Sequence, residues 1–298
     1  MHSSNPVFAR SEGFTGRGSS NAYGNVTYPG NGSSYQGYGG QPTPGYSDPS
    51  TWGTGAPQGP TAVDRGRMTI DTVVQKTGIT LGIVTVVAAI TWFLTGRPVS
   101  EAGVVDEAVA SQLMMLWMAG AFVGLGLGLV LSFKRTISPG LVIAYAVAEG
   151  VFIGAMSKWF ETLFPGVVMG AVIGTVAAVA GTLAAYKFFN ISVSPRFRKF
   201  VVAAAFGFVA VTLFDFVLGL FGNAIGFNGF GTLGLVMSFV GLALGVFMLI
   251  LDFDFVERGI AAGLPEVESW RAAFGLTVTI IWIYIEILRI LAILRGND

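Results

Sequence analysis

Long apolar runs without charge, separated by short polar segments, dominate the chain after residue 70. Residues 77–96, 108–133, 162–186 and 216–251 contain no Asp, Glu, Lys or Arg. A helix needs about 20 apolar residues to cross a bilayer. The pattern predicts seven spans, at about 77–95, 112–133, 139–157, 166–186, 200–222, 232–253 and 272–293. We therefore expect an all-α membrane protein, a bundle of seven transmembrane helices.

Residues 1–60 lack this pattern and are rich in Gly, Ser, Pro, Asn and Tyr. Such a segment cannot bury enough apolar surface to offset the entropy lost on ordering. We predict a disordered cytoplasmic tail over residues 1–70 and a transmembrane domain over residues 71–298.

Composition supports the membrane interpretation and excludes several function classes. The chain is 53% hydrophobic and 11% charged, whereas a soluble protein carries about 25% charged residues. Zero net charge argues against a nucleic-acid partner. The chain has no cysteine, and its one histidine is His2. Thiolate chemistry, iron–sulfur clusters, haem and histidine-based zinc sites are therefore not expected, and we predict neither an enzyme nor a cofactor.

The distribution of Lys and Arg predicts the orientation in the bilayer. With the N-terminus inside, eleven basic residues flank the spans on the cytoplasmic side: Arg65, Arg67, Lys76, Lys134, Arg135, Lys187, Arg196, Arg198, Lys199, Arg258 and Arg271. Three lie on the other side: Arg97, Lys158 and Arg295. We expect a cytoplasmic N-terminus and, after seven spans, an external C-terminus.

Glycines recur at four-residue spacing within several spans: Gly120, Gly124 and Gly128; Gly166, Gly170 and Gly174; Gly150 and Gly154; Gly241 and Gly245. Small residues on one helix face allow helices to approach closely in a lipid environment. The spacing predicts close packing within the bundle, with a dimer face as the alternative.

Ionisable residues inside the spans are costly, so they indicate function or pairing. Four are acidic, Glu149, Asp215, Asp252 and Glu286, and Arg289 is basic. Glu286 could simply be neutralised by Arg289, three residues further on. Asp252 could mark the end of its helix, because Asp254 and Glu257 follow at once. Asp215 could make a helix-bending or interhelical hydrogen bond, and Glu149 could be one buried, protonated carboxyl.

Taken together, these residues favour an ion or proton pathway. If Asp252 and Glu286 meet, like-charge repulsion makes the pair share a proton. Deprotonation would then push two helices apart and act as a pH-dependent gate. The same oxygens could hold a hard cation such as Ca²⁺. Lys134 or Arg135 could bind one carboxylate in a closed state.

Several segments in order resemble one known family. They are FKR at 133–135, AYAVAEG at 144–150, LILDFD at 249–254, IYIEILRIL at 283–291 and Arg-Gly at 295–296. On these residues, the chain from about residue 70 onward resembles the Bax-inhibitor family of seven-helix membrane proteins. SSNPVF at 3–8 is similar to its tailed actinobacterial branch. Bacterial members include pH-sensitive calcium leaks.

The resemblance implies roles for particular residues. The family's two sensor aspartates correspond to Asp252 and Glu286, with Glu in place of the second Asp. Its latch arginine corresponds to Lys134 or Arg135, and only Arg135 can form a bidentate fork.

The function implied is a cation leak of a bacterial cytoplasmic membrane, with Ca²⁺ or protons as permeant or regulating ions. The alternative is a non-conducting regulator that binds a membrane protease or another protein partner. Such a partner could dock on the N-terminal tail or on the 254–271 loop.

Overall fold

The computed structural model describes residues 66–100 and 103–296, and these residues form seven long α-helices. The helices are α1 (Ile70–Leu94), α2 (Glu107–Phe133), α3 (Pro139–Leu163), α4 (Val167–Phe188), α5 (Pro195–Leu220), α6 (Thr232–Ala261) and α7 (Glu268–Gly296). Each is long and apolar enough to cross a membrane, which confirms the predicted all-α class and its seven spans. Residues 1–65 of the predicted tail (1–70) lie outside the described residues, so its disorder and the domain boundary stay predictions.

Capping residues explain why several helices begin before the apolar runs. Thr69 forms a capping box with Thr72, so α1 begins seven residues before the predicted span. Asp106 accepts hydrogen bonds from two backbone N–H groups in the first turn of α2. Ser194 caps α5, which continues with a proline at its first position. Hydrophobicity shows where a helix crosses lipid, whereas polar caps decide where it begins.

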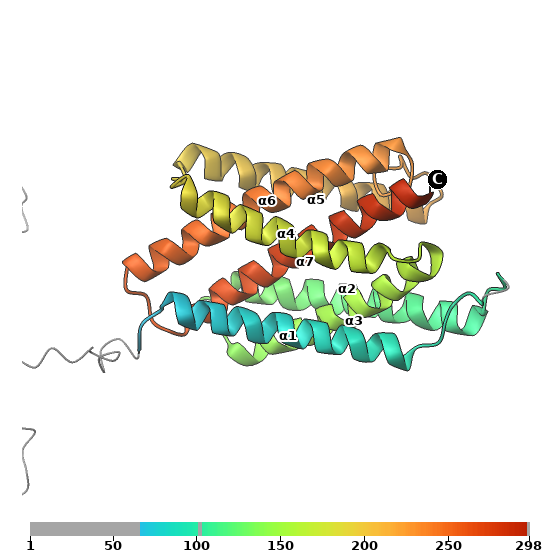
Figure 1. Cartoon of the computed structure of the whole chain (residues 1–298), viewed down its shortest axis with the longest axis horizontal. Coiled ribbons are helices and arrows are strands. Elements are labelled where there is room, and N and C mark those ends of the chain that lie inside the picture. The colour runs from blue at the N-terminus through green and yellow to red at the C-terminus, as the bar shows by residue number, and fades with distance from the viewer. Residues whose placement is uncertain (1–65, 101–102, 297–298) are drawn as a thin grey trace, which may run out of the picture. The chain divides into compact units, whose positions relative to one another are not determined.

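Helix α7 runs through the middle of the bundle (Figure 1). It packs against α1, α3, α4 and α6, while α1 and α2 both pack closely on α3. Among the described helices, α5 has close backbone contacts only with α6. The last helix therefore joins α1 and α3 to α4 and α6, while α2 is attached through α3 and α5 through α6.

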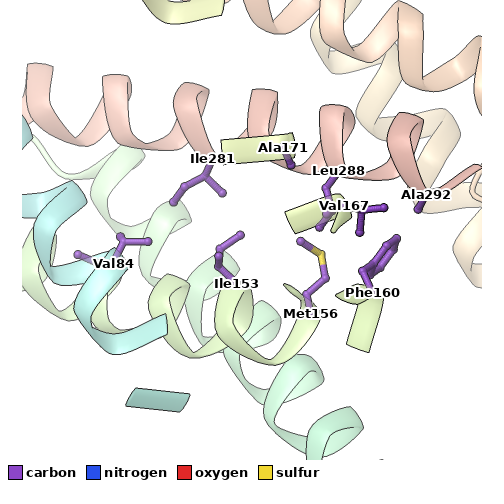
Figure 2. Close-up of a cluster of buried hydrophobic side chains, with 10 residues drawn as sticks. Val84, Ile153, Met156, Phe160, Val167, Ala171, Ile281, Leu288 and Ala292 are labelled. Atoms are coloured by element: carbon purple, nitrogen blue, oxygen red, sulfur yellow. The ribbon is translucent and has the colours of Figure 1, made fainter. Parts of the chain in front are cut away.

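The largest buried apolar cluster lies where α7 meets α1, α3 and α4. Figure 2 shows Ile281 and Leu288 of α7 beside Ile153, Met156 and Phe160 of α3. Leu288 is fully buried, whereas outward side chains such as those of α2 and α5 remain exposed in the isolated chain. Lipid tails cover such surfaces in a bilayer, so close packing holds the helices together.

The glycines allow close helix packing within the bundle, as their spacing predicts. An added Cβ on Gly150 would lie 2.9 Å from the Val84 carbonyl oxygen of α1, and one on Gly120 would lie 2.7 Å from the Phe152 nitrogen of α3. These contacts are backbone contacts, which cannot rotate away. The glycines therefore set the spacing of α1, α2 and α3.

Candidate functional site

Asp252 lies in the contact between α6 and α7. Its Oδ2 accepts a hydrogen bond of 2.6 Å from the Thr279 hydroxyl. The side chain lines a cavity of about 420 Å³, together with Arg198 and Arg258. Asp252 therefore does more than end its helix: it joins two helices beside a cavity.

Both arginines of that cavity bind Asp254, two residues further on. Arg198 donates to Asp254 at 2.9 Å, and Arg258 forms an ion pair with the same carboxylate. Asp254 is thus neutralised by two cations at the end of the bundle that the charge pattern assigns to the cytoplasm. Asp252 forms no ion pair among the described residues.

Glu286 lies deeper along the same contact between α6 and α7. It is 6% exposed, and its Oε2 has no hydrogen-bond partner among the described residues. A Cβ added to Gly241 of α6 would overlap the Glu286 carboxyl. The absence of a side chain at Gly241 makes room for this acid.

Arg289 does not pair with Glu286 in this structure. Its guanidinium donates to the carbonyl oxygens of Phe227 and Gly229, in the connection between α5 and α6. Mutual neutralisation of Glu286 and Arg289 through a direct ion pair is therefore not observed. Arg289 instead attaches that connection to α7.

Asp252 and Glu286 do not meet in this conformation. Asp252 is bound at Thr279, and Glu286 follows Thr279 by seven residues, about 10 Å along the helix axis. A direct hydrogen bond between carboxyls needs about 2.5–3.0 Å. The two acids occupy separate levels of one helix–helix contact, and their role as a gate stays a prediction.

The predicted latch residues also lie apart from the acids. Lys134 and Arg135 are exposed at the end of α2, and neither side chain has an ion pair with a described residue. Their carbonyl oxygens accept hydrogen bonds from Arg271 of α7, which also pairs with Glu268. Hydrogen bonds from the Arg271 side chain to backbone carbonyl oxygens thus join the end of α2 to α7, and a latch remains a prediction.

Asp215 has a structural role. It is 1% exposed, and its carboxylate accepts hydrogen bonds from the backbone N–H groups of Ile225, Gly226 and Asn228. Gly226 has a φ of 101°, a conformation that glycine adopts readily. The connection between α5 and α6 folds back onto Asp215, a contact that the apolar sequence around this residue does not reveal.

Glu149 lines a cavity of about 600 Å³ that Glu286 also lines. A Cβ on Gly124 of α2 would lie 2.8 Å from the Glu149 Oε1 atom. The structure therefore brings Glu286 to the same cavity as Glu149, rather than into contact with Asp252. Among the described residues, no group of three or more His, Cys, Asp or Glu side chains is placed to hold a metal.

Sequence reasoning missed a set of polar contacts made by α1. Lys158 of α3 is buried and donates to the carbonyl oxygens of Trp92 and Thr95, at the end of α1. The Thr80 hydroxyl is 2.8 Å from that of Thr277 in α7. Lys158 had been assigned only to an external flank. Hydroxyl residues inside apolar spans were the available signal for the threonine pair.

The fold and the buried acids define a class: a multi-pass, all-helical integral membrane protein with seven spans and carboxyl groups between its helices. The sequence profile described as Bax inhibitor 1 like matches residues 5–296. The chain therefore belongs to the Bax inhibitor 1-like family, whose members are generally non-enzymatic membrane proteins.

An uncharacterized protein of Chlamydia muridarum (strain MoPn / Nigg) is similar to this chain. The two are 25% identical over 175 residues, which is 56% of this chain and 71% of the chlamydial protein. Assignment to the actinobacterial branch stays a prediction.

Proposed function

We propose that this protein is a pH-sensitive cation leak, for Ca²⁺, in the cytoplasmic membrane of a bacterium. The supporting observation is that Asp252 and Glu286 both lie in the contact between α6 and α7, and neither has an ion pair with a described residue. A carboxyl that lacks a basic partner in an apolar setting favours a proton or a cation as its counterpart.

The separation of the two acids changes how such a gate would work. Direct pairing would require α7 to slide along α6 by about two helical turns. We propose instead that each acid acts at its own level. Loss of a proton from Asp252 places a charge at the Thr279 contact. Loss of a proton from Glu286 places a charge against Gly241 of α6, where an added Cβ would overlap the carboxyl. Both charges would loosen one helix–helix contact.

Ca²⁺ flux into proteoliposomes, measured at several pH values, tests this proposal. The wild-type protein is expected to pass Ca²⁺ at a rate that changes with pH. The double variant Asp252→Asn/Glu286→Gln should lose the pH dependence, because amides do not titrate in this range. Each single variant should lose part of it, and the two losses should add, as expected for separate sites. Pronounced non-additivity would instead indicate a coupled pair.

Two results would contradict the leak. The double variant could keep the full pH dependence, which would place the sensor elsewhere. Alternatively, the wild-type protein could pass no Ca²⁺ at any pH, which would favour the non-conducting regulator. The variant Glu107→Gln is a suitable control, because it removes an exposed acid at the start of α2.

A further inference from the structure

The cavity shared by Glu149 and Glu286 has no role in a gate made of Asp252 and Glu286 alone. It lies between α2 and α3 on one side and α5 and α7 on the other, with a volume of about 600 Å³. One water molecule occupies about 30 Å³, so the cavity has room for an ion with several waters. Asp252 lines a different cavity.

Two polar groups of this cavity lack partners. Glu286 is 6% exposed, and its Oε2 atom has no hydrogen bond to a described residue. The indole nitrogen of Trp282, which lines the same cavity, is also buried and unpaired in the described structure. Buried polar groups are normally satisfied by protein, water or an ion. The carboxylate oxygen therefore lacks the partner that a proton or a cation would supply, and the N–H group lacks the acceptor that a water molecule would supply.

The charges around the cavity favour a cation. Glu149 and Glu286 are the acidic side chains that line it, and the Tyr145 hydroxyl lies beside Glu149. Arg289, one turn from Glu286, directs its guanidinium to the Phe227 and Gly229 carbonyl oxygens. When both acids are ionised, their charge matches that of a divalent cation, and the nearby Arg289 offsets part of the charge of Glu286.

Glycines allow both carboxyls to approach this space. A side chain at Gly124 of α2 would contact the Glu149 carboxyl, and one at Gly241 of α6 would overlap that of Glu286. Each acid therefore lies against a glycine, and its nearest polar side chain is a neutral hydroxyl: Tyr145 beside Glu149 and Ser238 beside Glu286.

We propose that Glu149 and Glu286 together form a binding site for a hydrated divalent cation, separate from Asp252. Ca²⁺ takes six to eight oxygen ligands, and two carboxylates supply at most four. Water molecules complete the shell, in keeping with the size of the cavity. This inference rests on the proposed cation leak and identifies where its ion binds inside the membrane.

Calcium titration of the purified full-length protein in detergent tests the site. Isothermal calorimetry with CaCl₂ at constant ionic strength should show saturable binding. Glu149→Gln and Glu286→Gln should each weaken the affinity by about tenfold or more, a change of about 1.4 kcal/mol. Glu149→Asp keeps the charge and should retain part of the affinity. Asp252→Asn and the exposed control Glu107→Gln should leave binding within about twofold of the wild type.

Thermal unfolding of every variant without calcium identifies any variant that does not fold. If Glu149→Gln does not fold, the calcium affinity of Glu149→Asp tests the role of position 149. Unchanged affinity in both Gln variants would overturn the site. Loss of binding in Asp252→Asn alone would also overturn it, and would place the ion at the other cavity.

Flux measurements on the same variants separate this inference from the proposed function. If the wild type conducts and Glu149→Gln neither binds less Ca²⁺ nor conducts less, the site is wrong and the leak stands. If neither the wild type nor any variant passes Ca²⁺, but both Gln variants lose calcium binding, the leak is wrong and the site stands.

Discussion

Replacing Gly154 by alanine is expected to lower the free energy of unfolding by about 3 kcal/mol, the upper end of the range for overpacked cores. The added Cβ would lie 2.6 Å from the Ala88 carbonyl oxygen and 2.8 Å from the Thr91 Cβ atom, both on α1. Backbone atoms cannot rotate aside, so α1 and α3 must separate. The midpoint of thermal unfolding in detergent measures this loss.

Gly126→Ala provides the matched control. Gly126 also lies within a transmembrane helix, but an added Cβ there meets nothing within 4 Å. The control should be neutral or slightly stabilising, because alanine has the higher helix propensity. Equal effects of the two substitutions would show that helix propensity, rather than the approach of α1 to α3, decides the outcome.

Replacing Asp215 by alanine is expected to cost about 3 kcal/mol, because it leaves three backbone N–H groups without an acceptor. The connection between α5 and α6 would then be held mainly by Arg289, through carbonyl oxygens. Thermal unfolding gives the stability loss. Limited proteolysis should show faster cleavage between α5 and α6.

Asp106→Ala provides the comparison for Asp215. Asp106 also accepts backbone N–H bonds, but at an exposed helix start, so its removal should cost about 1 kcal/mol. The loss of stability in Asp215→Asn should lie between those of Asp215→Ala and Asp106→Ala, because an amide oxygen can still accept hydrogen bonds. If Asp215→Asn were as damaging as Asp215→Ala, the negative charge rather than the hydrogen-bond geometry would be the stabilising feature.

Helices α1 and α2 show which parts of the fold the sequence predicts and which it does not. Apolar runs without charge were sufficient to find both spans, because lipid requires about 20 apolar residues. The predicted starts at residues 77 and 112 were late, since the caps at Thr69 and Asp106 extend both helices. Local polar chemistry decided these ends.

The candidate site was predicted residue by residue, but its arrangement was not. Glu149, Asp252 and Glu286 were identified because ionisable groups are rare inside apolar spans. Their grouping depends on how α3, α6 and α7 align along their axes. A shift of one helical turn moves a side chain by about 5 Å along the helix axis. The local sequence does not predict how far one helix is shifted relative to its neighbour.

The sequence alone determined the class of protein, the number of spans and the identity of the acids within them, because these depend on local hydrophobicity and composition. Only the tertiary structure decided which groups meet. Asp215 binds a loop and Arg289 binds carbonyl oxygens, while Glu286 lines a cavity with Glu149 and Asp252 lines another. The physical reason is that the cavity of Glu149 and Glu286 arises from the register and close approach of helices distant in the chain, which glycines such as Gly124 and Gly241 permit. Asp215 and Arg289 bind an irregular connection whose course no periodic pattern predicts.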